Sequence, residues 1–282
     1  MVPTVIDLSR RAFLLAASTA GLGCGGCSSI ASAVTSARAT SDGVVHIGNS
    51  THLIVLDGVH VLTDPWVRDP AEGILRHSVP PAPLPIKVDC VLVTHEHEDH
   101  FDLAALALID KRAVLVVPAW LQARARPLGF AKLLAVQAGD VIEDVVGLKL
   151  TVVQAKHDVD ELAYRFERAG RSVFFGGDTL PTPQIAALAA QAPVDFAILP
   201  GTGGSLMGTR YVMDAPEAIA MAQAFGVDQH KRGALLTHHE FVVSPQFPWA
   251  MIIDLPPLDA RAFPAWFRVP TPGEQLPFPW MS

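Results

Sequence analysis

The segment VLVTHEHEDHF, residues 91–101, constrains the chain more than any other. Its first residues are apolar and β-branched, a pattern typical of a buried strand. Three histidines and one aspartate follow within six positions, namely His95, His97, Asp99 and His100. Alternate residues of an extended segment face the same side, so His95 and His97 face one point, and the other two face a second point where the chain turns. Imidazole and carboxylate groups at this density predict a metal site.

Three more groups of the same chemical type follow strands later in the chain. His157 ends LTVVQAKH, Asp178 ends SVFFGGD, and His238 ends GALLTH. Open sheets place ligand groups at strand ends, so we expect these side chains to join the first four. His239 competes with His238 for the last position. We favour His238 because it leaves the predicted strand at the expected place.

The predicted centre holds two divalent ions and seven ligands. The first ion is assigned His95, His97 and His157, the second Asp99, His100 and His238, and Asp178 bridges the two. This donor set favours Zn²⁺, with Mn²⁺ or Fe²⁺ as alternatives. We take the carboxylates Asp99 and Asp178 as the catalytic residues. Water shared by two cations is deprotonated near neutral pH, so the centre predicts hydrolysis by a metal-bridging hydroxide.

Asp64, in the segment LTDPW, has two interpretations that the sequence leaves open. One is a turn residue in front of Pro65. The other is an acceptor that orients a ligand histidine. Five other histidines lack a partner pattern and are expected in strands, loops or on the surface: His46, His52, His60, His77 and His230. Aromatic residues such as Trp66, Phe247 and Trp249 are expected in the core more than in a substrate groove.

Strands and helices alternate along residues 40–282, which predicts one α/β sandwich domain. Expected strands span 44–47, 52–56, 59–62, 89–94, 113–117, 148–154, 162–167, 172–175, 195–199 and, as the last, 234–237. Expected helices span 103–111, 183–190 and 216–225, and a proline-rich irregular loop spans 64–86. Asp57-Gly58 predicts a hairpin turn. Cys90, in the apolar segment VDCVLV, is expected to be a small buried residue.

Residues 1–39 have the features of an export signal. The segment DLSRRAFLL resembles a twin-arginine motif, and the apolar run 12–23 after it is too short to span a membrane. Ala-x-Ala cleavage sites lie at 31–33 and 37–39. We therefore expect the twin-arginine machinery to export the chain to the periplasm or cell envelope. Cys24 and Cys27 follow weakly lipoprotein-like segments, so a lipid anchor is an alternative.

Charge and hydropathy restrict the partners. The formal net charge is −7, and an acidic surface repels phosphate backbones, so a nucleic-acid substrate is disfavoured. No stretch reaches the roughly 18 apolar residues of a membrane-spanning helix. A small-molecule substrate is therefore expected.

The ligand motifs, in their order and strand-end positions, resemble those of the metallo-β-lactamase fold superfamily over residues 44–240. Five segments resemble the branch that contains ascorbate-phosphate lactonases and N-acyl phosphatidylethanolamine phospholipase D: HIGNSTHLIVLDGVHVLTDPW, VDCVLVTHEHEDHFD, GRSVFFGGDT, FAILPGTGG and MDAPEAIAMAQAFG. The chain departs from that branch at Asn49, where a histidine is usual, and at His239, where an aromatic residue is expected.

The resemblance implies a four-layer αββα sandwich with the metals at one edge between the sheets. It also implies hydrolysis, because di-iron redox relatives carry a carboxylate in place of His97. We expect an exported hydrolase of a small ester, lactone or related bond. The alternatives are a phosphodiesterase or phospholipase-D-like hydrolase, and a non-catalytic metal-binding protein of the same fold. Loops at 65–86, 201–214 and 241–250 are expected to determine the substrate.

Overall fold

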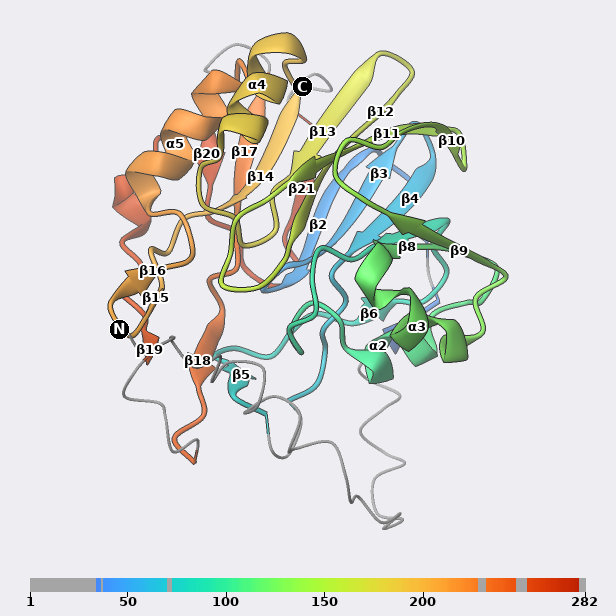
Figure 1. The fold of residues 1–282 in the computed structure, drawn as a ribbon, viewed down its shortest axis with the longest axis horizontal. Coiled ribbons are helices and arrows are strands. Elements are labelled where there is room, and N and C mark those ends of the chain that lie inside the picture. Colours follow the sequence, from blue (N-terminus) through green and yellow to red (C-terminus); the bar gives the residue numbers. More distant parts are fainter. Residues whose placement is uncertain (1–33, 37, 70–72, 228–231, 247–252, 279–282) are drawn as a thin grey trace, which may run out of the picture.

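The computed structural model describes residues 34–36, 38–69, 73–227, 232–246 and 253–278. Two seven-stranded sheets pack face to face, and helices cover the outer face of each (Figure 1). The four layers run helix, sheet, sheet, helix, as the sequence predicted. Most of the predicted export signal, with Cys24 and Cys27, lies outside the described residues, as do His230, Phe247 and Trp249.

The first sheet carries the strand that leads into the histidine-rich segment. Its strand order is β21-β2-β3-β4-β7-β8-β9. The bounds are β2 Gly43–Gly48, β3 Thr51–Leu56, β4 Val59–Thr63, β7 Cys90–Leu92, β8 Val114–Pro118, β9 Lys132–Val136 and β21 Gln275–Pro277. Strands β4, β7, β8 and β9 are parallel. The β3–β4 hairpin turns at Asp57 (φ 48°) and Gly58 (φ 76°), which confirms the predicted turn.

The second sheet carries the strands that precede the other predicted ligands. Its order is β10-β11-β12-β13-β14-β17-β20. The bounds are β10 Val141–Val145, β11 Leu148–Gln154, β12 Leu162–Arg168, β13 Arg171–Phe175, β14 Phe196–Pro200, β17 Gly233–Thr237 and β20 Phe267–Arg268. β13, β14 and β17 are parallel, and β11 runs the same way because β12 is antiparallel to both β11 and β13.

Helices α4 (Pro183–Gln191) and α5 (Ala215–Ala224) cover the second sheet, and α2 (Leu103–Leu108) and α3 (Gln122–Ala125) cover the first. Short 3₁₀ helices span Ala119–Leu121, Arg126–Leu128 and Ala260–Ala262. Asp214 and Glu217 form a capping box that begins α5. α2 ends three residues before the predicted Lys111, whose Nζ instead donates to the carbonyl of Leu106 at 2.7 Å.

Two expectations were wrong, one about a loop and one about the last strand. Residues 64–86 contain two short strands, and residues 234–237 are not the last strand, because β20 and β21 extend the two sheets. The remaining short strands are β1 Val34–Thr35, β5 Leu75–His77, β6 Leu84–Pro85, β15 Ser205–Leu206, β16 Thr209–Arg210, β18 Phe241–Val243 and β19 Ile253–Asp254. Strands of two or three residues are too short to show a period of two in the sequence.

An apolar core fills the space between the sheets. Ile54 and Leu92 of the first sheet pack there against Phe166 and Phe175 of the second. Cys90 is fully buried in this core, as predicted, and burial raises the pKa of its thiol to about 12. No helix in the described part of the chain is long and apolar enough to cross a membrane. Trp66 is also fully buried, so it belongs to the core and not to a groove.

Candidate metal centre

The predicted ligands meet at one edge of the sandwich. Residues 95–100 follow β7 of the first sheet, and the other three follow β11, β13 and β17 of the second. These four strands all present their carboxyl ends to this edge. The apolar core between the sheets therefore gives way here to buried polar side chains. All seven predicted side chains lie together, although they span more than 140 residues of sequence.

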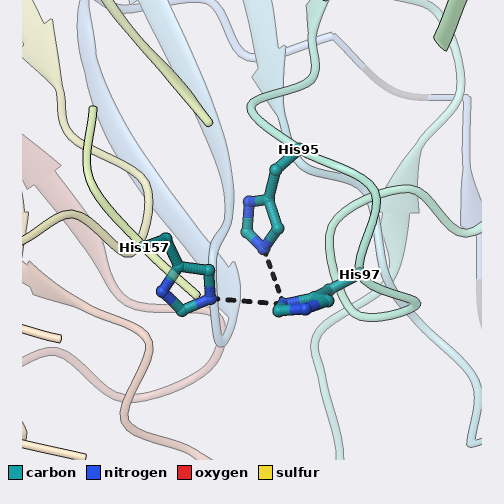
Figure 2. A group of neighbouring side chains, drawn as sticks. All are labelled: His95, His97 and His157. Carbon is teal, nitrogen blue, oxygen red and sulfur yellow. Dashed lines mark hydrogen bonds between the residues drawn. The ribbon is translucent and has the colours of Figure 1, made fainter. Parts of the chain in front are cut away.

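The outer group, as it is called here, consists of His95, His97 and His157. Its three rings converge on one point (Figure 2). His95 Nε2 lies 3.0 Å from His97 Nδ1, and His157 Nε2 lies 3.2 Å from the same atom. One ligand nitrogen from each ring lies within 4.8 Å of the others. Three ring nitrogens directed at a common point are the arrangement of a three-histidine metal site.

The second set, here called the inner group, consists of Asp99, His100 and His238. Asp99 Oδ2 lies 3.3 Å from His100 Nε2 and 3.2 Å from His238 Nε2. All three residues are buried, with 3% exposure or less. His239 instead directs its Nε2 to the carbonyl oxygen of Pro270 at 3.0 Å, so His238 and not His239 lies at the centre.

Asp178 contacts both groups. Its Oδ2 lies 3.0 Å from His238 Nε2 and 3.2 Å from His100 Nε2 in the inner group. The same oxygen lies 3.7 Å from His157 Nε2 in the outer group. Asp178 is therefore placed where a bridging ligand would lie.

Asp64 contacts a predicted ligand histidine, as the second of its two interpretations expects. Its Oδ2 lies 2.7 Å from His100 Nδ1, and its two carboxylate oxygens accept from the backbone N–H and the hydroxyl of Thr94. With Nδ1–H held by Asp64, His100 presents Nε2 to the inner group. On the outer group, His157 Nδ1 lies 2.9 Å from the carbonyl oxygen of Tyr211, which presents Nε2 in the same way.

Glu161 is a buried carboxylate that the sequence did not single out. Its Oε1 accepts from the backbone N–H of Asp178 at 2.7 Å and lies 3.2 Å from His95 Nδ1. Burial raises the pKa of Glu161 to about 8. A Cβ on Gly177 would lie 2.3 Å from Glu161 Oε1, and Gly177 has φ +63°, so glycine is required for this close approach. In the sequence, Glu161 ends an acid-rich turn, and nothing distinguishes it from Asp158 or Asp160.

Asn49 supports the inner group. It stands where the branch that this sequence resembles usually has a histidine. It adopts a left-handed conformation (φ 49°), which asparagine tolerates. Its Nδ2 donates to Asp99 Oδ2 at 3.1 Å, and its carbonyl oxygen accepts from the backbone N–H of His238 at 3.2 Å. The two-residue turn between β2 and β3 thus holds two members of the inner group.

The polar atoms of the centre fit a cation. His100 Nε2 and Asp178 Oδ1 are buried without a hydrogen-bond partner among the described residues. Unpaired polar atoms of this kind are costly unless another group satisfies them. Burial also lowers the pKa of His97 to about 4, which keeps this ring neutral as metal ligation requires. Nitrogen and carboxylate donors in these proportions suit zinc.

The remaining histidines separate into two kinds. His60 Nε2 lies 2.8 Å from the carbonyl oxygen of Ala39, and His77 stacks on Trp66 at 3.6 Å between ring centroids, as expected for residues without a site role. His46 of β2 and His52 of β3 also lie in strands, as expected, but they are not isolated. Their rings contact each other, and His46 also contacts Glu240.

A cavity of about 520 Å³ lies near the centre, although none of the seven predicted ligands lines it. Phe241 lines it and also packs against the His238 ring, with 4.4 Å between ring centroids. The other lining residues are Thr202, His239, Val242, Val243, Ile253, Asp254, Leu255, Pro256, Pro257 and Leu258. Most of these side chains are apolar, and none of these residues is a lysine or arginine.

Comparisons with known proteins agree with this arrangement. The family model described as "Beta-lactamase superfamily domain" matches residues 44–226. An uncharacterized protein of Mycobacterium tuberculosis is 27% identical over 251 residues, covering 81% of this chain and 67% of that protein. A protein of Koribacter versatilis named as a metal-dependent hydrolase is 27% identical over 199 residues, covering 64% of this chain and 78% of the relative.

Two solved structures share the fold at lower sequence identity. An isothiocyanate hydrolase from Delia radicum gut bacteria superposes with a TM-score of 0.64 at 19% identity, over 83% of this chain and 98% of that one. A possible metal-dependent hydrolase of Veillonella parvula gives a TM-score of 0.68 at 17% identity, over 84% and 99% of the two chains. These likenesses confirm the predicted four-layer fold.

Proposed function

The chain belongs to the β-lactamase superfamily, and from this premise we propose that it is an exported, dinuclear metal-dependent hydrolase of small esters, lactones or related bonds. The observation that carries the proposal is the convergence of all seven predicted side chains, with Asp178 in contact with both groups. Relatives that carry the name metal-dependent hydrolase support the reaction class.

The seven side chains would hold two divalent ions, most favourably Zn²⁺, one in each group. When bound there, such ions would supply a hydroxide nucleophile at neutral pH and stabilise negative charge that develops on the substrate. The outer group presents ring nitrogens of His95, His97 and His157. Asp99 and Asp178 contribute the two carboxylates of the centre, and these are the residues we assign as catalytic.

The surrounding residues fix the positions of these ligands. Asp64 holds His100, and Asn49 holds Asp99 and the backbone of His238. Glu161 holds the backbone N–H of Asp178 at 2.7 Å. Because these ligands are held by second contacts, much of the arrangement exists before substrate binds, which lowers the cost of reaching the transition state.

The cavity beside His238 supports an ester or lactone over a phosphodiester. Its lining side chains, such as Phe241, Ile253 and Leu255, suit the apolar part of a carboxylic ester. Among its described residues, the lining includes one carboxylate, that of Asp254, and a carboxylate repels the negative charge of a phosphodiester. We therefore place the acyl or lactone portion of the substrate in this cavity.

We also propose export through the twin-arginine machinery, with cleavage after Ala33 and not after Ala39. Val34 and Thr35 pair with Leu84 and Pro85 of β6, and Arg38 forms a 2.6 Å ion pair with Asp89. Cleavage after residue 33 keeps both contacts, whereas cleavage after residue 39 removes them. Mass spectrometry of the exported protein distinguishes the two sites and also detects a lipid on Cys24 or Cys27.

The test of the function is a substrate panel run on the purified protein with and without added zinc. We expect turnover of aryl esters and γ- or δ-lactones, loss of turnover after treatment with a chelator, and its return when zinc is restored. Faster turnover of bis(p-nitrophenyl) phosphate than of every ester would support a phosphodiesterase instead. Zinc binding without turnover of either class would support a non-catalytic metal-binding protein.

A further inference from the structure

A second cluster of metal-ligating side chains lies beside the centre and shares no residue with it. His46 of β2, with His239 and Glu240 directly after β17, forms what is here called the auxiliary group. One ligand atom from each of the three residues lies within 4.8 Å of the others. We propose that the auxiliary group binds a further divalent cation, zinc by preference, with two imidazoles and one carboxylate.

The distances and burial in the auxiliary group suit a metal. His46 Nε2 lies 2.7 Å from Glu240 Oε2, and His239 Nε2 lies 3.7 Å from Glu240 Oε1. Ligand atoms about 2.0–2.1 Å from a tetrahedral zinc ion are separated by about 3.3 Å, a value between these two distances. The three side chains are 0%, 5% and 8% exposed for His46, His239 and Glu240, so a negative carboxylate is held almost out of water.

The hydrogen-bond chain beyond His46 sets the direction of its protons. The Thr237 hydroxyl lies 3.2 Å from the carbonyl oxygen of Asn49 and must donate to it, because a carbonyl only accepts. His52 Nε2, 2.9 Å from that hydroxyl, is then the donor to Thr237, and His52 Nδ1 is left with a lone pair. His46 Nδ1 faces this lone pair at 3.2 Å and therefore carries the proton.

This direction leaves His46 Nε2 with a lone pair that faces the Glu240 carboxylate at 2.7 Å. Two acceptors at that distance require a cation between them, either a second proton or a metal ion. A proton would satisfy this one pair of atoms. A metal ion would satisfy this pair and His239 as well.

His239 supplies an independent indication. Its Nδ1 is buried without a hydrogen-bond partner among the described residues, and its Nε2 lies close to two oxygens, Glu240 Oε1 at 3.7 Å and the carbonyl of Pro270 at 3.0 Å. In either neutral tautomer, the nitrogen that carries the lone pair meets no donor from these residues. A metal ion beside Glu240 would take the Nε2 lone pair of the Nδ1–H tautomer, which a proton between His46 and Glu240 cannot do, and this is why the observations favour a metal.

The auxiliary group is accessible from the cavity of about 520 Å³, which His239 lines. A site with three protein ligands leaves a fourth zinc position for water or another small ligand, and the cavity provides the path. Asn49 connects this group to the centre, because its backbone N–H donates to Glu240 Oε2 and its Nδ2 donates to Asp99 Oδ2, each at 3.1 Å.

The test counts metal ions in the full-length protein. Wild-type protein and two variants, His239→Phe and Glu240→Gln, are loaded with Zn²⁺, passed through a desalting column and analysed for zinc per chain. Phenylalanine keeps a flat ring against His46, whose ring lies 5.4 Å away at an interplanar angle of 18°. His77→Phe is the matched control, because His77 is a buried histidine outside both sites.

We expect each of the two variants to bind one equivalent of zinc fewer than wild type, and His77→Phe to bind as many as wild type. Equal zinc content in wild type, His239→Phe and Glu240→Gln would overturn the proposal. If a variant fails to fold, a zinc-edge anomalous map of wild-type crystals decides, since it must show a peak between His46, His239 and Glu240.

The same experiment separates this inference from the proposed function. His97→Ala removes zinc from the centre and leaves the auxiliary group intact. A further loss of one equivalent in the double variant His97→Ala/His239→Phe supports the auxiliary site even if no hydrolysis is found. No further loss in the double variant contradicts it.

Discussion

The outer and inner groups of the centre use similar side chains at the same edge of the sandwich, but they differ in exposure and support. The His97 side chain of the outer group is 19% exposed, whereas His100, Asp99 and His238 of the inner group are almost fully buried. The inner group is held by the side chains of Asp64 and Asn49. In the outer group, Glu161 contacts His95 and a backbone carbonyl at Tyr211 holds His157, and the partly exposed His97 is the member that sets this group apart.

This difference indicates a division of work between the two positions. A buried site whose ligands are each fixed by a polar neighbour holds its ion tightly and excludes water. A site with an exposed ligand is open to a substrate and to exchange with solution. We therefore expect the outer position to face the substrate and the inner position to be the higher-affinity one.

The largest expected effect comes from the residue that joins the two groups. Asp178→Ala removes the oxygen that contacts His100, His238 and His157. We expect hydrolysis to fall by at least about 10³-fold, because metal-assisted stabilisation of the transition state is worth several kcal/mol. Initial rates on the best ester of the panel measure this, with circular dichroism as the control for folding. Wild-type rates from a folded Asp178→Ala protein would exclude Asp178 as a catalytic ligand.

An intermediate effect is expected from Asp64→Asn, which should weaken metal binding in the inner group and leave the outer group unchanged. Asparagine keeps the shape of the side chain and tolerates the positive φ of 34° at this position, but its amide is a weaker partner for His100 Nδ1–H. Affinity for the more tightly bound ion should fall by about 10–100-fold, while the weaker ion is unaffected. Competition with a chromophoric chelator measures both constants. If only the weaker constant changes, the order of the two sites is reversed.

The smallest effect is expected where the second sheet supports the segment before His95. The Tyr164 hydroxyl donates to the carbonyl oxygen of Val93 at 2.6 Å in a buried position. Tyr164→Phe removes this hydrogen bond and should lower the free energy of unfolding by about 1 kcal/mol. Urea denaturation of the zinc-loaded protein measures the change. Metal affinity of both groups should stay as in wild type, and a large drop in affinity would show that Tyr164 positions His95.

The sequence predicted which side chains meet at this edge better than it predicted the residues that support them. His95, His157, Asp178 and His238 each lie within three residues of the end of a strand, and parallel strands bring such positions to one edge. Glu161 carries no comparable signal, since its contact with Asp178 depends on the close packing of Gly177 across two strands. Positions of this kind are fixed by tertiary structure and not by local pattern.

The difference between local pattern and tertiary contact also explains which strands were predicted and why the contact of His46 was not. The longer apolar strands, such as β3 and β11, were predicted within a residue or two at each end, whereas β9 and β10, each five residues long, were missed. The short β20 and β21 depend on pairing with β17 and β2 and have no pattern of their own. The sequence shows no partner pattern for His46 because its contact, Glu240, is 194 residues away.

The most direct test of the central claim is a zinc-edge anomalous difference map from crystals of the full chain grown with Zn²⁺. The account predicts two peaks at the edge of the sandwich, one coordinated by His95, His97 and His157 and the other by Asp99, His100 and His238, with Asp178 between them. A map with no peak at these side chains, or with a single peak that Asp178 does not contact, would contradict it.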